Sequence, residues 1–164
     1  MKKFVVLLVV LCAAMSVMAQ DVVSDFQKKY GNGEEFTNIN ISAKMFQMMA
    51  SVAEPETEEI VKNLTGMKVL TAEKDMAKYY QDAVAFVNRS GSGYEELMSV
   101  QEKDEDVRMF TKESKGVITE LIIIVGGKKD FVLMGITGKI DLKQMAKLSK
   151  SMNINGMEYL NRVK

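Results

Sequence analysis

The sequence predicts an α+β fold: an antiparallel sheet, made of a C-terminal four-strand meander and two short early strands, with helices mainly on one face. Two observations predict it. Apolar residues recur at three- and four-residue steps in the first half of the chain, and from residue 94 onwards they alternate with a period of two. Helix and strand patterns alternate early and the later strands follow one another directly, an order typical of α+β domains.

The first 19 residues are typical of a secretory signal peptide. Met1-Lys2-Lys3 precede an apolar run, and Val17 and Ala19 occupy the −3 and −1 positions of a cleavage site. A buried helix or a membrane anchor is the alternative, but a spanning helix needs about 20 apolar residues, and Asp21 follows too soon for one.

We therefore expect residues 20–164 to form a single exported domain, periplasmic or associated with the cell envelope. A lipoprotein anchored through Cys12 is disfavoured, because Leu11 stands where a small residue is expected. No stretch after residue 19 is apolar enough to be expected to span a bilayer. At about 150 residues a chain buries roughly 68–70% of its unfolded surface, which is enough for one domain.

Composition removes several classes of function. The 22 basic residues balance the 22 acidic ones, so the chain lacks the positive field that sequence-independent nucleic-acid binding requires. There is no His, and the single Cys lies in the predicted signal peptide. The exported chain therefore has no thiol nucleophile, no Ser-His pair and no Cys or His to bind zinc.

The first half of the exported chain alternates predicted helices with predicted strands. A helix over 21–30 places Phe26 and Tyr30 on one stripe and ends at the following glycines. Ser42 is expected to cap the next helix, and Pro55 to open another at its first position. The full predicted order is helix 21–30, strand 36–41, a helix after Ser42 with Met45, Phe46 and Met49 on its apolar stripe, a helix from Pro55 that includes Leu64, strand 67–72 and helix 74–88.

Two hairpins are predicted after the flexible segment 89–93. The first joins strands 94–102 and 107–114, and the second joins strands 117–125 and 131–140 through the turn 126–130. Asp141 with Gln144 resembles a capping box that opens a last helix, followed by a short tail over 157–163. The sequence leaves open where the two early strands lie in the sheet.

Four segments together resemble a known family. They are the signal peptide, the "TNINISAKMFQMM" entry from strand into helix, the "MKVLTAE" strand and the "LIIIVGGKKDFVLMGITGKIDLKQMAKLSKSM" hairpin into helix. The chain resembles the exported Bacteroidetes proteins grouped as domain of unknown function 4252. The resemblance implies a small exported α+β domain with no assigned activity, and it provides no functional residues to carry over.

No motif predicts a metal or a cofactor. Met45 and Met48 have a spacing that could offer thioethers to Cu(I), but a gap-filling core helix is the favoured interpretation. Acidic runs over 54–59 and 102–106 could attract Ca²⁺, yet neither matches an EF-hand loop, and a solvated turn and a helix start are favoured. Gly126-Gly127-Lys128-Lys129 precedes a strand rather than a helix, so it predicts a hairpin turn and not a phosphate loop.

The 117–140 hairpin provides the candidate binding surface. If Val125 pairs with Phe131, one face of the hairpin carries Leu121, Ile123, Val125, Phe131 and Leu133. The opposite face then carries Ile122, Ile124, Val132 and Met134, and we expect that face to meet the helices. The first face must also be covered. We favour the chain's own residues, 21–30 or 157–163, as its cover, over a protein partner, a second copy or an apolar ligand.

Two classes of function stay open. The first is a non-catalytic exported binding or protein-interaction module, whose partner is an unknown protein or a small apolar ligand, with a homo-oligomer as a further alternative. The second is a carboxylate-based hydrolase of the cell envelope. Because the exported chain has no His, no Cys and no catalytic motif, we expect a binding module, with no catalytic residue, no metal and no cofactor.

We predict that the exported chain begins at Gln20, because Val17 and Ala19 fit the cleavage pattern. Mass spectrometry of the N-terminus, on protein from its native host, tests this. A lipid-modified Cys12 would contradict both the cleavage site and the Cys-free chemistry of the exported chain.

Overall fold

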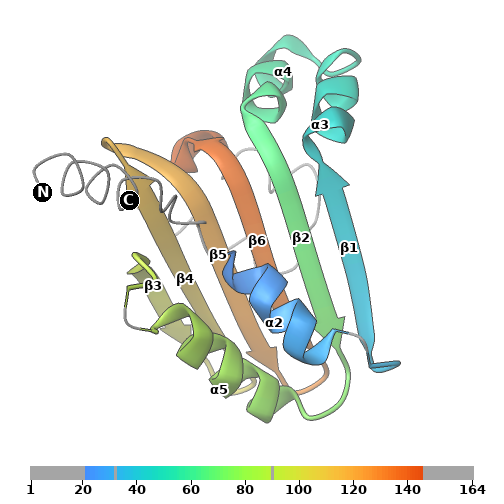
Figure 1. Ribbon diagram of the computed structural model, residues 1–164, viewed down its shortest axis with the longest axis vertical. Coiled ribbons are helices and arrows are strands. Elements are labelled where there is room, and N and C mark those ends of the chain that lie inside the picture. The colour runs from blue at the N-terminus through green and yellow to red at the C-terminus, as the bar shows by residue number, and fades with distance from the viewer. Residues whose placement is uncertain (1–20, 32, 90, 146–164) are drawn as a thin grey trace, which may run out of the picture.

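The computed structural model describes residues 21–31, 33–89 and 91–145 of the chain (Figure 1). The predicted signal peptide over 1–19 and the predicted tail over 157–163 lie outside the described residues, so both stay predictions. Among the described helices, none is long and apolar enough to cross a membrane.

The α+β prediction is confirmed. The helices and strands follow the predicted order, and their boundaries differ from the prediction by a few residues. The described helices are α2 (Val22–Tyr30), α3 (Ala43–Ala50), α4 (Pro55–Lys62) and α5 (Met76–Val87). The strands are β1 (Phe36–Ser42), β2 (Leu64–Ala72), β3 (Glu95–Gln101), β4 (Glu105–Ser114), β5 (Val117–Gly127) and β6 (Phe131–Ile140).

The six strands form one antiparallel sheet in the order β1-β2-β6-β5-β4-β3 (Figure 1). The C-terminal meander is therefore extended by β2, which pairs with β6, and then by β1 at the edge. β2 can take the inner position because it is buried on both faces, whereas β1 exposes most of its residues. Local sequence carries no information about this placement, since it depends on pairing across about 65 residues.

Side chains cap helix starts at Ser42 and Asp141, as predicted, and also at Asp21, which the prediction placed inside the helix. The Asp21 side chain accepts a hydrogen bond from the backbone N–H of Ser24 at the start of α2. Ser42 accepts from the N–H of Met45 at 3.3 Å, and Asp141 accepts from the N–H groups of Lys143 and Gln144 at 2.9 and 3.2 Å. Each carboxylate or hydroxyl satisfies an N–H that the first helical turn leaves without an intrahelical partner.

The helices lie on both faces of the sheet, rather than mainly on one. On one face, α2 and α5 pack over a cluster that includes Phe26, Leu70, Ile122, Ile124 and Leu133. On the other, α3 and α4 join a cluster that includes Phe46, Ile60, Val69, Leu121 and Ile123. We name these the α2–α5 face and the α3–α4 face.

Two details of the early helices differ from the prediction. Leu64 belongs to β2 and not to the helix before it, because pairing with β6 continues through Gly66 to Leu64. Met45 is 50% exposed, although the helical spacing placed it on an apolar stripe. In α3, Phe46 and Ala50 are the residues that are fully buried.

The predicted pairing of the second hairpin is wrong by one residue. Val125 lies opposite Val132, and it is Gly126 that lies opposite Phe131. The two glycines at 126 and 127 are part of β5, and the N–H of Gly127 donates to the carbonyl of Asp130 at 2.9 Å. The loop is therefore shorter than predicted, and a shift of one residue places side chains on the opposite face of the sheet.

Two glycines allow the helices of the α2–α5 face to approach the sheet. A Cβ on Gly135 would lie 2.6 Å from a methyl carbon of Val23 in α2. A Cβ on Gly126 would lie 2.7 Å from the ring of Tyr80 in α5. Both positions exclude any larger residue unless the helix moves outward.

The burial of β5 on both faces sets the expected behaviour of two variants. An external partner on the face of Ile123 would have allowed Ile123→Asp to fold, but residues of the chain itself cover that face. Ile122 and Ile123 are 2% and 0% exposed on opposite faces. We now expect both Ile122→Asp and Ile123→Asp to lose more than about 3 kcal/mol of unfolding free energy, because each buries an unpaired carboxylate.

Circular dichroism during urea unfolding measures the effect of each substitution. Val117→Asp is the matched control, because Val117 begins the same strand and is 36% exposed; it should cost less than about 1 kcal/mol. A folded, native-like Ile123→Asp variant would contradict the assignment of that residue to the core.

Candidate functional site

The five residues predicted as a binding surface do not share a face. Leu121, Ile123 and Val125 belong to the cluster of the α3–α4 face, and Phe131 and Leu133 belong to the cluster of the α2–α5 face. All five are at most 2% exposed. The faces differ because the true pairing is shifted by one residue. The chain's own α2 packs on the side that carries Phe131 and Leu133, whereas Leu121, Ile123 and Val125 lie in the cluster that α3 and α4 join.

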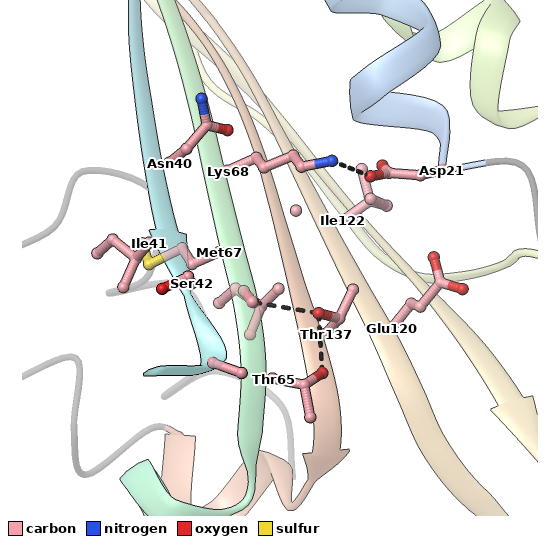
Figure 2. Close-up of a pocket in the computed structure, with 14 residues that line it drawn as sticks. Asp21, Asn40, Ile41, Ser42, Thr65, Met67, Lys68, Glu120, Ile122 and Thr137 are labelled. Carbon is pink, nitrogen blue, oxygen red and sulfur yellow. Dashed lines mark hydrogen bonds and ion pairs between the residues drawn. The ribbon is translucent and has the colours of Figure 1, made fainter. Parts of the chain in front are cut away.

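A pocket of about 470 Å³ lies instead on the α2–α5 face, where α2 begins (Figure 2). In Figure 1, α2 and α5 cross the half of this face that is remote from α3 and α4, and α2 begins over the middle of the sheet. The pocket is formed at that start by strands β1, β2, β6 and β5, and we name it the polar pocket. It is lined by Asp21, Asn40, Ile41, Ser42, Ala43, Thr65, Gly66, Met67, Lys68, Glu120, Ile122, Gly135, Ile136 and Thr137.

On the α2–α5 face, the side chains change from apolar to polar along each central strand. On β5 the residues of this face run from Ile124 and Ile122 under the helices to Glu120 in the pocket. On β2 they run from Leu70 to Lys68 in the same direction. The helices therefore cover the apolar part of the face, and the polar part lines the pocket.

Asp21 and Lys68 form an ion pair at one end of the pocket, which Figure 2 shows as a dashed line. The Lys68 ammonium also donates to the Ser24 hydroxyl, which donates to the Asp21 carboxylate at 2.8 Å. Burial raises the pKa of Asp21, but the hydrogen bonds from Lys68 and Ser24 more than offset it, so the pKa lies below its ordinary 3.8. Asp21 is thus an anion at neutral pH and fastens α2 to β2.

Glu120 lines the pocket from β5, on the same side of the view as Asp21 (Figure 2). Its carboxylate accepts a hydrogen bond from the hydroxyl of Tyr94 and lies 3.9 Å from the Lys112 ammonium. Burial raises the pKa of the Tyr94 hydroxyl, and the hydrogen bond to Glu120 raises it further. Tyr94 therefore remains a proton donor to Glu120 across the physiological pH range.

Uncharged polar groups complete the lining on β1, β2 and β6. The Thr65 hydroxyl donates to the Thr137 hydroxyl at 3.1 Å, and Thr137 donates to the backbone carbonyl of Gly66 at 3.3 Å. Asn40 projects from β1, whose residues around it are exposed. The arrangement offers hydroxyls, an amide and two carboxylates to a ligand, and Ile41, Ala43, Met67, Ile122 and Ile136 add apolar surface.

Acidic residues do not gather into a metal site in the described part of the chain. No group of three or more Asp or Glu residues there is placed to hold an ion together. In the acidic turn singled out by the sequence, Asp104 pairs with Lys128 of the neighbouring hairpin.

Sequence reasoning missed the polar pocket because its residues come from four strands and the starts of two helices. One pattern could have indicated it. Lys68 interrupts the apolar run of β2, and Glu120 and Thr137 interrupt the corresponding runs of β5 and β6. Only the strand order and register place these interruptions side by side.

Residues 30–148 match the family model described as Domain of unknown function (DUF4252). No curated protein and no solved structure matches the chain. The match covers all six strands and leaves Asp21 and most of α2 outside it.

Asp21 should stabilise the fold in a pH-dependent way. Because its pKa is lowered on folding, its stabilising effect is present above pH 3.8 and is lost as the pH falls through the folded pKa. At pH 7, Asp21→Ala should lose about 1 kcal/mol of unfolding free energy through the missing cap. Asp21→Asn keeps a capping oxygen and should lose at most about 1 kcal/mol through the exposed ion pair.

Urea unfolding of the wild type and both variants, repeated from pH 7 down to pH 2.5, measures these differences. The gap between the wild type and Asp21→Asn should narrow as the pH falls below 3.8, since protonation of Asp21 removes the charge that pairs with Lys68. A gap that stays constant with pH would show that the Lys68 ion pair contributes nothing.

Proposed function

Because the chain belongs to the DUF4252 family, whose description assigns no function, we propose a role from the site itself: a non-catalytic binding module whose polar pocket holds a small polar molecule. In keeping with the features that resemble exported Bacteroidetes proteins, we place this module outside the cytoplasm, at the cell envelope. The single observation that carries the proposal is the polar pocket, whose volume lies in the range of small-molecule sites.

The ligand class follows from the lining. The Lys68 charge is balanced by Asp21, and Glu120 is held by Tyr94 and Lys112, so no unpaired charge among these groups calls for an ion of opposite sign. Hydroxyl and amide groups of Ser42, Thr137 and Asn40 suit a ligand rich in hydroxyls or amides. A sugar or a short peptide has both the polar groups and the apolar ring or side-chain surface that suit this lining, whereas the sequence left an unknown protein or a small apolar ligand open.

The alternative of a carboxylate-based hydrolase is less well supported. Its basis is that two carboxylates, Asp21 and Glu120, line one pocket. A general acid needs a pKa raised towards neutrality, whereas the pKa of Asp21 is lowered.

A panel of monosaccharides, disaccharides, free amino acids and dipeptides tests the proposal by thermal shift and by NMR chemical-shift mapping. A ligand at about 100 times its Kd should add about 2.7 kcal/mol to the unfolding free energy. Asn40→Ala should weaken binding about tenfold, because one hydrogen bond is worth about 1 kcal/mol or more. The fold should be unaffected, since Asn40 is exposed.

Thr37→Ala is the matched control, since Thr37 is also exposed on β1 but lies on the opposite side of the strand. It should leave the affinity unchanged. A ligand whose chemical-shift changes avoid the polar pocket, or one that Asn40→Ala does not weaken, would contradict the proposed site. If the whole panel fails to bind, the assignment to sugars and short peptides is wrong.

A further inference from the structure

The sheet ends in two edge strands that differ sharply. β3 carries Glu95 and Glu96, and its pairing with β4 shifts register between Glu96 and Met98. β1 has the sequence FTNINIS, with no charge and no proline, and its pairing with β2 is regular over all seven residues. Five of those seven residues are exposed.

Charges, prolines and bulges are the usual means by which proteins prevent an edge strand from pairing with another chain. β3 has two of these features and β1 has none. The outer edge of β1 therefore presents a regular row of backbone N–H and C=O groups that a further β-strand can extend. In Figure 1, β1 forms the outermost strand of the sheet, and no described element lies beyond it.

Exposed apolar side chains lie beside this edge. Ile39 in β1 is 48% exposed, and Met45 and Met48 in the helix that directly follows β1 are 50% and 56% exposed. Burial of such side chains favours association, and methionines adapt readily to a partner surface. The edge therefore combines unprotected backbone with apolar surface.

The β1 sequence is complementary to itself. About a two-fold axis through Ile39, an antiparallel copy places Ile39 opposite Ile39 and Asn38 opposite Asn40. Thr37 then lies opposite Ile41, and Phe36 opposite Ser42. Residues directly opposite one another share a face, so asparagines meet on the α2–α5 side and isoleucines on the α3–α4 side, with no charge opposed to a like charge.

We propose that two copies of this chain associate through β1, antiparallel and two-fold symmetric about Ile39, so that their sheets become continuous. The self-complementary, neutral sequence selects a second copy over a strand of another protein. An isologous interface of this kind closes on itself and limits assembly to a dimer.

The dimer also bears on the polar pocket, although it does not depend on that pocket binding a ligand. Asn40 and Ser42 line the pocket from the edge strand. In the proposed register they lie opposite Asn38 and Phe36 of the second copy, so the second copy would extend the pocket wall at its β1 side.

Sedimentation equilibrium of the wild type and of Ile39→Lys and Ile39→Glu, alone and mixed, tests the proposal. The wild type should be a dimer that dissociates on dilution. Each variant alone should self-associate at least about tenfold more weakly, because like charges lie opposite each other, and an equimolar mixture should restore the dimer. Ser99→Lys, at an exposed position of edge strand β3, is the matched control and should leave the dimer intact.

Hydrogen exchange of the wild type provides a test that needs no variant. Backbone N–H groups on the outer side of β1 should be protected in concentrated solution and exchange faster on dilution. A wild type that stays monomeric at all concentrations, or single Ile39 variants that dimerise as well as the wild type, would overturn the proposal. Failure of the mixture to restore the dimer would overturn the register about Ile39.

Discussion

The pairing of β5 with β6 at the centre of the sheet supports the rest of the structure. None of the residues 121–125 in β5 is more than 2% exposed, although their side chains alternate between the two faces of the sheet. A strand that is apolar on both faces must be covered on both. Accordingly, α2 and α5 pack on one face of the sheet, and α3 and α4 pack on the other. The domain therefore has three layers, whereas helices on a single face would give two.

The close approach of α2 to this hairpin determines where the polar pocket lies. Gly135 leaves room for Val23, so the first turn of α2 sits directly on β6. Asp21, at the cap of that helix, then reaches Lys68 on β2. The pocket begins where the helix does, because the sheet continues past the helix start with polar side chains on the same face. Asp21 therefore has two roles: it caps α2, and it lines the polar pocket.

The polar pocket and the edge of the sheet share β1. Its residues on the α2–α5 side include Asn40, which lines the pocket, and those on the other side include Ile39, which is half exposed. A strand with so little burial contributes less to the core than β2 or β6 does. Its regular register and uncharged sequence leave its outer edge open to the pairing with a second copy that we propose.

The sequence by itself determined the local elements. Period-two alternation identified the meander, and the caps at Ser42 and Asp141 located helix starts, because these features depend on neighbouring residues. Tertiary structure decided the strand order, the one-residue shift that pairs Val125 with Val132, and the division of helices between two faces. These depend on how many residues the turn at 128–130 uses and on which distant strands can bury β2 and β5. The polar pocket belongs to the second group, since Lys68, Glu120 and Asp21 are far apart in sequence and meet only through the sheet order and the position of α2.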